Sequence, residues 1–281
     1  MKFRRIICAV FFTLATMSIF VFTLEQNHGL LQIYFLDIGQ GDATYIRTPG
    51  GHDMLIDGGP SRIILQKLAE VMPFYDRSID VVIETHPDAD HIGGLPSVLE
   101  RYNVGLFLEP GIESKNAIDD EIRRIRAEKN IPRELARRGM IINFGEGAHF
   151  DVLYPDRDVY GLKDTNEASI VGQMKYGRTT VMLAGDSPKK IENRLIVMDG
   201  ERLKSDILKA GHHGSHTSSG ENYVKTVAPR YAVVSAGRKN RYGHPHADVL
   251  EIFEKLGVKI ARTDREGTVE FVSDGRSITE K

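Results

Sequence analysis

The run His86-Pro87-Asp88-Ala89-Asp90-His91 constrains this chain more than any other feature of its sequence. Two imidazoles and two carboxylates occupy six positions, directly after the short apolar run Val81–Glu84. A strand that ends there places His86 at the start of a loop. Because successive side chains point in alternating directions, His86 and Asp88 can face one metal position. Asp90 and His91 then face a second centre about 3.5–4 Å away, as in two-metal sites. The run therefore predicts a metal-binding loop at the end of a strand.

The donor types limit which metals this loop can hold. Imidazole nitrogens and carboxylate oxygens suit zinc or manganese, and harder cations gain as carboxylates replace imidazoles. The single cysteine, Cys8, can form neither an internal disulfide nor a thiolate zinc site. We therefore expect two divalent ions, either zinc or manganese.

Two further polar clusters also follow expected strands. The cluster Ala184-Gly185-Asp186 comes directly after Thr179–Leu183, where Asp186 can bridge two cations or cap the helix expected from Pro188. The run Gly211-His212-His213-Gly214-Ser215-His216 follows the expected strand Ile207–Ala210. Because three imidazoles and a hydroxyl between glycines are hard to explain by packing, this run favours a role in ligand or substrate binding.

A fourth cluster, Asn240-Arg241-Tyr242-Gly243-His244-Pro245-His246, follows the expected strand Tyr231–Ser235. His246 can instead cap the helix expected from Asp248. Three basic residues lie just before or within this cluster, namely Arg238, Lys239 and Arg241. A basic groove built from them beside the metals would favour a nucleic-acid substrate.

Length and charge restrict the class of protein further. A chain of 281 residues holds one large or two small domains, and no Pro/Gly/Ser-rich linker divides residues 31–281. The formal net charge of −2 does not indicate a strongly basic nucleic-acid binder, although a local patch can still bind nucleic acid. Short β-rich runs alternate with helices, which predicts an α/β domain. The charge-dense segment Ile112–Arg138 is expected to be an exposed surface helix, or else to turn its arginines to substrate.

The N-terminus has the pattern of an export or anchoring signal. Lys2, Arg4 and Arg5 precede an uncharged run of 19 residues from Ile6 to Leu24. This run has the ~17–25 residues of a membrane span and exceeds the ~7–15-residue hydrophobic region of a cleaved signal. We expect residues 1–25 to be an uncleaved signal-anchor, with a cleaved signal peptide as the alternative. By the positive-inside rule, the domain 26–281 then lies outside the membrane, either anchored or secreted.

Taken together, these motifs resemble one known family. The matching runs are Phe35–Ala43, Ile56–Gly59, Thr85–Gly94, Ala184–Asp186, Leu208–Ser215 and Tyr242–His246. The chain is similar to the metallo-β-lactamase-fold hydrolases, and most closely to the soluble nuclease-like domain of ComEC-type DNA-uptake proteins. The resemblance covers about residues 31–273. It implies an αββα sandwich, with two sheets face to face, helices outside and metals at one sheet edge.

The resemblance also implies roles for single residues. The implied metal ligands are His86 and Asp88 for one ion, Asp90 and His91 for the other, Asp186 as the bridge and His212 to complete a site. His213 is the alternative to His212, and Asp57 would be a structural aspartate beside the site. The superfamily pattern has a His where this chain has Asp88, and its separate His before the bridging Asp is missing. Asn166 lies in that segment, as a weak ligand or a substrate contact.

The implied chemistry is metal-assisted hydrolysis of a phosphodiester. Asp90 can hold the attacking water, and His213, His216 or His244 can protonate the departing alkoxide. Substrate contacts are expected from Asn166, Lys209, Ser215, His216 and His246. The expected protein is an exported or membrane-anchored nuclease that acts on DNA or another phosphodiester.

Two other functions fit the same motifs. One is a metallohydrolase for another exported substrate, such as a phosphorylcholine-type ester or a lactam. The other is a non-catalytic metal-binding module that recognises an anionic partner. One hydrophobic run cannot form a DNA channel, and no protein partner is identifiable from the sequence.

Overall fold

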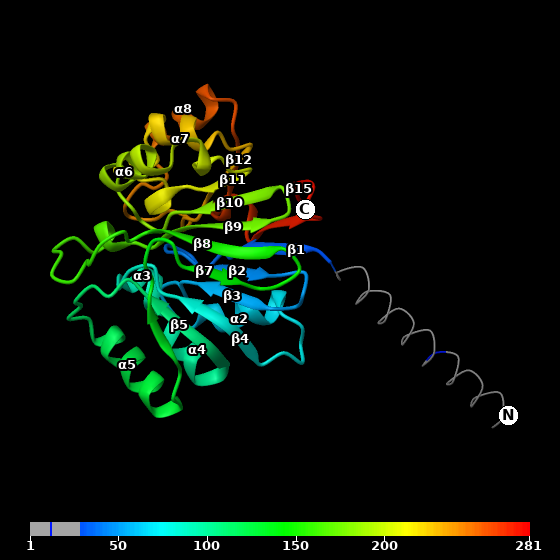
Figure 1. The fold of residues 1–281 in the computed structure, drawn as a ribbon, viewed down its shortest axis with the longest axis vertical. Helices are drawn as coiled ribbons and strands as arrows, with labels where there is room; N and C mark the ends of the chain where they lie inside the picture. Colours follow the sequence, from blue (N-terminus) through cyan, green and yellow to red (C-terminus); the bar gives the residue numbers. More distant parts are fainter. Residues whose placement is uncertain (1–11, 13–28) are drawn as a thin grey trace.

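Two β-sheets lie face to face in the computed structural model, which describes residues 12 and 29–281 (Figure 1). The first sheet has eight strands in the order β15-β14-β1-β2-β3-β4-β5-β6. Its strands are β1 (Leu31–Phe35), β2 (Thr44–Arg47), β3 (Asp53–Ile56), β4 (Ser78–Ile83), β5 (Asn103–Glu109), β6 (Arg133–Leu135), β14 (Val269–Ser273) and β15 (Ile278–Glu280).

The second sheet has seven strands in the order β13-β12-β11-β10-β9-β8-β7. These are β7 (Ile141–Asn143), β8 (Ala148–Tyr154), β9 (Val171–Tyr176), β10 (Thr179–Leu183), β11 (Ile207–Lys209), β12 (Tyr231–Val234) and β13 (Lys259–Arg262). The α-helices are α2 (Ile63–Val71), α3 (Ala89–Ile92), α4 (Leu95–Arg101), α5 (Ala117–Lys129), α6 (Lys189–Asp199), α7 (Glu221–Val227), α8 (Ala247–Lys255) and α9 (Thr263–Glu266). Short 3₁₀ turns are η1 (Thr165–Ala168), η2 (Gly200–Leu203) and η3 (Gly211–Gly214).

Three apolar cores hold four layers together. Successive strand residues point to opposite faces of a sheet. In β3, Met54 and Ile56 therefore join the core between the sheets, while Leu55 joins the core under α2, α4 and α5. In β10, Leu183 faces the first of these cores and Met182 faces the core under α6, α7 and α8. Because both strands are apolar on both faces, each sheet needs a partner on either side, and the predicted αββα sandwich is confirmed.

The parallel strands bring the polar motifs to one edge. β3, β4, β5 and β6 run parallel in the first sheet, and β10, β11, β12 and β13 run parallel in the second. The carboxyl ends of parallel strands lie at the same edge of a sheet. Asp57 follows β3, His86 follows β4, Asp186 follows β10 and His212 follows β11. The loops that carry chemistry thus meet where both sheets end.

The segment 112–138 differs from its predicted form. Only α5, residues 117–129, is helical, and after Pro132 the chain forms β6, which pairs in parallel with β5. The helix ends at Asn130, which adopts a left-handed φ of 54°, and the Pro132 carbonyl accepts a hydrogen bond from the Phe107 N–H at 2.8 Å. On α5, Arg123 pairs with Asp119, and Arg124 pairs with acidic residues of its own helix. The part expected as a surface helix is therefore shorter, and these two arginines are neutralised locally.

The predicted signal segment, residues 1–25, lies outside the described residues except for Phe12. Across the described part of the chain, no helix combines the length and the apolar character needed to span a membrane. The division into segment 1–25 and domain 26–281 stays a prediction.

Two backbone hydrogen bonds join the loop after β3 to the segment that contains His91 and Gly94. The Gly58 N–H donates to the His91 carbonyl at 2.7 Å, and the Gly94 N–H donates to the Gly59 carbonyl at 2.9 Å. A Cβ atom at Gly94 would lie 2.2 Å from the Gly58 carbonyl oxygen, which is rigid backbone. Gly94 is therefore required for the close approach of these two loops.

Replacing Gly94 with Ala should lower the free energy of unfolding by about 1–3 kcal/mol, because the new methyl group forces the loops apart. Gly50→Ala is the matched control, since a Cβ there would meet its nearest atoms at 3.6 Å. An exposed site of that kind should change stability by about 0.5 kcal/mol or less. Urea unfolding of both variants measures the difference. Equal effects would show that the loop contact is not tight.

Candidate metal centre

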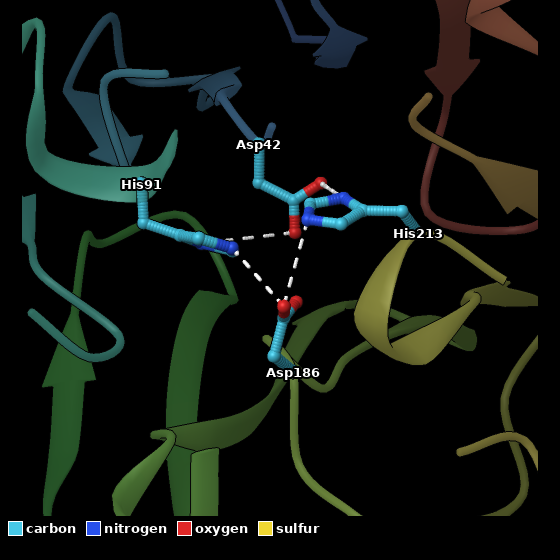
Figure 2. A group of neighbouring side chains, drawn as sticks. All are labelled: Asp42, His91, Asp186 and His213. Atoms are coloured by element: carbon cyan, nitrogen blue, oxygen red, sulfur yellow. Dashed lines mark ion pairs between the residues drawn. The ribbon is translucent and has the colours of Figure 1, made fainter. Parts of the chain in front are cut away.

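Four buried side chains converge where the two sheets end (Figure 2). Asp42, His91, Asp186 and His213 each offer one ligand atom, and these atoms lie within 4.8 Å of one another. The Nε2 atoms of His91 and His213 lie 3.3 and 3.5 Å from Asp186 Oδ2. Residues from both sheets thus share one carboxylate.

Asp186 has two further imidazole neighbours. The Nε2 atoms of His86 and His212 lie 4.0 and 3.6 Å from the same Oδ2 atom. Four imidazole nitrogens therefore surround one carboxylate oxygen within 4.0 Å. Asp186 is also the residue that the sequence predicts as the bridge between two ions, and its central position suits that role.

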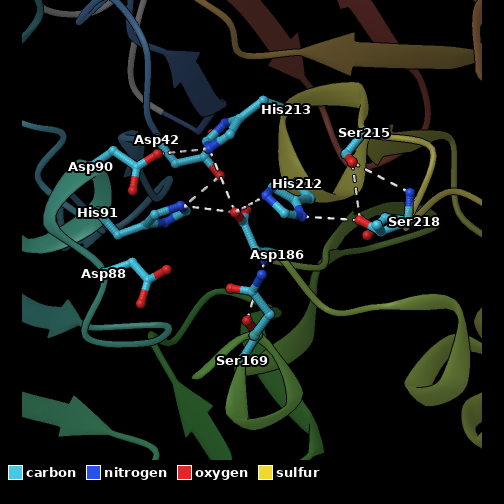
Figure 3. A network of polar contacts seen from close by, with 12 residues as sticks. Asp42, Asp88, Asp90, His91, Ser169, Asp186, His212, His213, Ser215 and Ser218 are labelled. Carbon is cyan, nitrogen blue, oxygen red and sulfur yellow. Dashed lines mark hydrogen bonds and ion pairs between the residues drawn. The ribbon is translucent and has the colours of Figure 1, made fainter. Parts of the chain in front are cut away.

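The two remaining carboxylates of the metal-binding loop flank this centre (Figure 3). Asp90 Oδ2 lies 3.2 Å from His213 Nε2, and the Asp90 side chain is one-third exposed. Asp88 Oδ2 lies 3.8 Å from His86 Nε2, and its Oδ1 accepts a hydrogen bond from the Thr165 hydroxyl at 2.6 Å. The structure therefore brings all six predicted metal ligands to one place. The assignment of each residue to an ion stays a prediction.

The donor set fits a cation. Within the part of the chain that the structure describes, His86 Nε2, His91 Nε2 and Asp186 Oδ1 are buried and have no hydrogen-bond partner. A buried polar atom left unpaired costs about 1–3 kcal/mol. Imidazole nitrogen and carboxylate oxygen are both common zinc ligands. A divalent ion would satisfy these atoms together, which no side chain in the site does.

A buried carboxylate orients His91 from behind. Asp57 Oδ2 lies 2.8 Å from His91 Nδ1, so Nε2 is directed toward Asp186. Asp57 is itself held by the backbone N–H and the hydroxyl of Thr85, at 2.8 and 2.7 Å. Carboxylates behind metal-binding histidines commonly fix the tautomer and ring orientation in this way. Asp57 thus lies beside the site, at the position predicted for it.

Asp42 lies behind His213, and the sequence motifs assigned it no role. His213 Nδ1 hydrogen-bonds the Ser235 carbonyl at 3.1 Å and lies 3.3 Å from Asp42 Oδ1, while Lys209 forms an ion pair with Asp42 Oδ2. Because Asp42 faces the outer nitrogen of His213 and already neutralises a lysine, we assign it, together with the Ser235 carbonyl, to orientation rather than to ligation. A Cβ at Gly41 would lie 2.1 Å from the Asp90 carbonyl oxygen, so glycine there lets the Asp42 N–H donate to that oxygen at 3.1 Å. The signal for Asp42 was its place after Gly41 in a loop before a strand.

The backbone of η3 is strained where it presents both histidines. His212 and His213 have φ angles of 49° and 55°, in the left-handed region that residues other than glycine rarely occupy. Each such residue costs of order 1–3 kcal/mol and persists only where its surroundings enforce it. Here the strain lets two consecutive imidazoles face the same carboxylate.

The site is a strongly coupled set of charges. Burial would raise the pKa of Asp186, but positive charge on His213 and His91 outweighs burial and holds that pKa well below its usual range. Burial would lower the pKa of His91, and the negative charges of Asp186 and Asp57 instead raise it well above normal. Burial and the nearby His91 lower the pKa of His86 to about 4. The protein without metal therefore keeps positive charge next to Asp186, where a cation would lie.

The remaining predicted histidines form an outer group. The His244 ring lies 5.5 Å from the His212 ring and 6.1 Å from the His213 ring, between centroids. The Nδ1 atoms of His216 and His246 lie 3.1 Å apart, and His246 Nδ1 also accepts the His216 N–H. His246 occupies the N-cap position of α8, but its side chain makes no capping hydrogen bond.

Two predicted substrate contacts, Lys209 and Ser215, are buried and bonded to other protein groups. Lys209 is 3% exposed and its ammonium group is bound to Asp42, so it supports the site from inside instead of contacting a substrate. Ser215 is also buried and accepts hydrogen bonds from Thr217. Asn166 lies in η1, next to the Thr165 that contacts Asp88, and its side-chain Oδ1 is buried with no hydrogen-bond partner among the residues that the structure describes. A role for Asn166 stays a prediction.

Comparison with known proteins identifies similar chains. Residues 36–238 match the profile described as the Metallo-beta-lactamase superfamily. The chain is 29% identical over 283 residues to ComE operon protein 3 of Bacillus subtilis, covering 95% of this chain and 35% of that protein. It is 30% identical to Competence protein ComA of Neisseria gonorrhoeae, covering 88% of this chain and 33% of that protein. The chain therefore spans about a third of the length of these curated relatives.

Solved structures share the fold at low sequence identity. The metallo-beta-lactamase fold protein YhfI from Bacillus subtilis superposes with a TM-score of 0.57 at 12% identity, over 86% of this chain and 99% of that chain. Igni18, a metallo hydrolase from Ignicoccus hospitalis, gives a TM-score of 0.56 at 17% identity, over 86% and 98% of the two chains. These similarities establish the fold alone.

Lys209→Met should destabilise the fold by about 3–5 kcal/mol, because it leaves the Asp42 carboxylate buried without its cation. The double variant Asp42→Asn/Lys209→Met removes both charges and should recover part of that loss. Urea unfolding of the two single variants and the double variant gives the coupling energy. Strictly additive effects would contradict a buried pair at this position.

Proposed function

Because the chain belongs to the metallo-β-lactamase superfamily, we propose that it is an exported, membrane-anchored, metal-dependent nuclease. The observation that carries the hydrolase part is the single carboxylate oxygen of Asp186 within 4.0 Å of four imidazole nitrogens. The nuclease part draws support from relatives named Competence protein ComA of Neisseria gonorrhoeae and Recombination protein 2 of Haemophilus influenzae. Membrane attachment draws on the sequence of residues 1–25.

The site supports a division of ligands between two ions. His86, Asp88 and Asp186 would hold one ion, and Asp90, His91 and Asp186 would hold the other. His213 rather than His212 suits the second group, because its Nε2 lies 3.2 Å from Asp90 and 3.5 Å from Asp186. His212 is 27% exposed and faces Asp186 from the outer side. Two divalent cations bound there would supply positive charge against a phosphodiester and lower the pKa of a water molecule.

Two protein side chains, Asp90 and His244, would then bind the attacking water and donate a proton to the leaving group. Asp90 has a partly exposed carboxylate at the centre and can hold an attacking water. The His244 ring lies 5.5 Å from the His212 ring, between centroids. This position beside the centre favours His244 as the proton donor to the leaving group. Burial and the charges of His213 and His212 lower the pKa of His244 to about 4. His244 is therefore neutral near pH 7 before substrate binds, and the negative charge of a bound phosphate must raise its pKa for it to serve as the acid.

Exposed cations beside the centre favour a polyanionic substrate. The loop between β12 and α8 contains Arg238, Lys239 and Arg241, all exposed. None of these three forms an ion pair with any residue among 29–281. Arg241 also lines the same pocket as Asp90. By contrast, the arginines of α5 that were considered above are already paired, so this loop is the better candidate for phosphate binding.

Asp186→Ala should reduce DNA cleavage by at least about 100-fold, because it removes the carboxylate that both ions would share. The test uses the purified full chain, stripped of metal, with labelled single- and double-stranded DNA and with Mn²⁺, Zn²⁺ or Mg²⁺ restored. Asp248→Ala, which removes an exposed carboxylate from α8, is the matched control and should retain activity. Cleavage should also weaken steeply with salt.

Two outcomes would contradict the nuclease proposal. Intact DNA together with turnover of a phosphorylcholine ester would indicate an envelope esterase. Bound metal with no turnover of either substrate would indicate a binding module. Full activity of Asp186→Ala with all metals supplied would refute the bridging role.

A further inference from the structure

A pocket of about 460 Å³ adjoins the metal centre on the side of the basic loop. It is lined by Gln40, Pro60, Ala89, Asp90, Asn240, Arg241 and Tyr242. Asp90 belongs to the metal-binding loop of the first sheet, whereas Arg241 and Tyr242 come from the loop after β12 in the second sheet. A ligand in this pocket would therefore be in contact with the metal centre at one end and with an aromatic and a cationic side chain at the other.

Tyr242 presents an unusual surface for this position. Tyr242 is a large aromatic residue, yet it is 49% exposed. The Tyr242 and His244 rings are inclined by only 22°, with centroids 5.7 Å apart. Arg241 lies against the same ring, with Cζ 4.9 Å from its centroid, and donates a hydrogen bond to the Tyr242 hydroxyl at 2.7 Å. The ring and the guanidinium thus form one wall of the pocket.

The side chain of Asn240 holds this wall in place. The Asn240 side chain accepts the backbone N–H groups of Tyr242 and His244, at 3.2 and 3.0 Å. It also donates to the carbonyls of Gly237 and His244, at 2.9 and 2.6 Å. One half-buried amide therefore fixes the turn that displays the tyrosine. Such preorganisation lowers the ordering cost of binding.

The ligand that combines these features is a nucleotide within a single strand. Exposed aromatic rings and arginine guanidinium groups bind unpaired bases by stacking, with little sequence preference. The adjacent metal centre would take the phosphate. A base inside a duplex is already stacked and paired, so it cannot reach a wall of this kind without being extruded.

We propose that Tyr242, together with Arg241, forms a base-stacking subsite that binds the nucleotide next to the cleaved phosphate and selects single-stranded nucleic acid. This proposal rests on the proposed nuclease function. Tyr242 is a specificity residue here and does not touch the reacting atoms. Its loss should therefore raise KM for a single strand while kcat remains within about twofold.

The test compares Tyr242→Leu with Tyr242→Phe in the full chain. Tyr242→Leu should raise KM for a labelled 12-nucleotide thymidine strand roughly 10-fold, which corresponds to losing one stacked base. Tyr242→Phe keeps the ring and loses only the hydroxyl contact with Arg241, so its KM should stay within about threefold of wild type. The preference for this strand over a blunt duplex should fall in Tyr242→Leu alone.

A strand with one abasic position beside the cleaved phosphate provides the decisive comparison. On this abasic strand, KM of the wild type should rise by about the factor by which KM of Tyr242→Leu rises on the intact strand. KM of Tyr242→Leu on the abasic strand should rise no further, because the variant and the abasic position remove the same contact. Additive losses, or equal KM values for wild type and Tyr242→Leu, would overturn the stacking subsite.

A binding measurement separates the two proposals. Fluorescence anisotropy of the labelled 12-mer is recorded with Asp186→Ala and with Asp186→Ala/Tyr242→Leu, neither of which should cleave it. Roughly tenfold weaker binding by the double variant supports stacking. If the wild type cleaves no DNA but this difference persists, the nuclease proposal fails and the stacking subsite stands. Equal binding by the two variants overturns the subsite even if the wild type cleaves DNA.

Discussion

The whole site depends on one buried carboxylate, Asp186, which lies among four imidazoles where both sheets end. A buried charge needs compensation, and here the compensating groups come from opposite halves of the molecule. His86 and His91 follow β4 of the first sheet, whereas Asp186 and His213 follow strands of the second. The core between the sheets therefore does more than stabilise the fold, because it also fixes the distance between the two halves of the ligand set. The parallel arrangement of the central strands is what brings these loops to one edge.

Support from behind the ligands is as extensive as the ligand set itself. Asp57 orients His91 through its outer nitrogen, whereas the outer nitrogen of His213 bonds the Ser235 carbonyl and faces Asp42, which Lys209 neutralises. Buried charge pairs contribute little net stability in general, but the removal of one partner is costly. The left-handed backbone at His213 and these buried charge pairs both cost stability. The surrounding fold therefore maintains the geometry of the site at the expense of stability. The Asn240 turn holds Tyr242 in a comparable way on the open side.

The sequence predicts the fold and the location of the site better than it predicts single roles. The motif spacing places His86 to His91 and Asp186 together, because strand ends and loop alternation follow from local pattern. Roles that depend on burial were not accessible in this way. Lys209 reads as a phosphate contact, yet β11 is covered on both faces, and its ammonium group meets Asp42 inside the protein. The choice between His212 and His213 depends on two unusual φ angles that no spacing rule predicts. The strand β6 was missed because its three residues pair only through a tertiary contact with β5.

Anomalous X-ray scattering from crystals of the protein grown with Mn²⁺ tests the central claim most directly. Two peaks about 3.5–4 Å apart are expected, on either side of the Asp186 carboxylate. One peak should lie beside His86 and Asp88, and the other beside Asp90, His91 and His213. A single peak coordinated by Asp42 in place of Asp90 would contradict the assignment of Asp42 to orientation. The absence of any peak at this edge would contradict the metal centre itself.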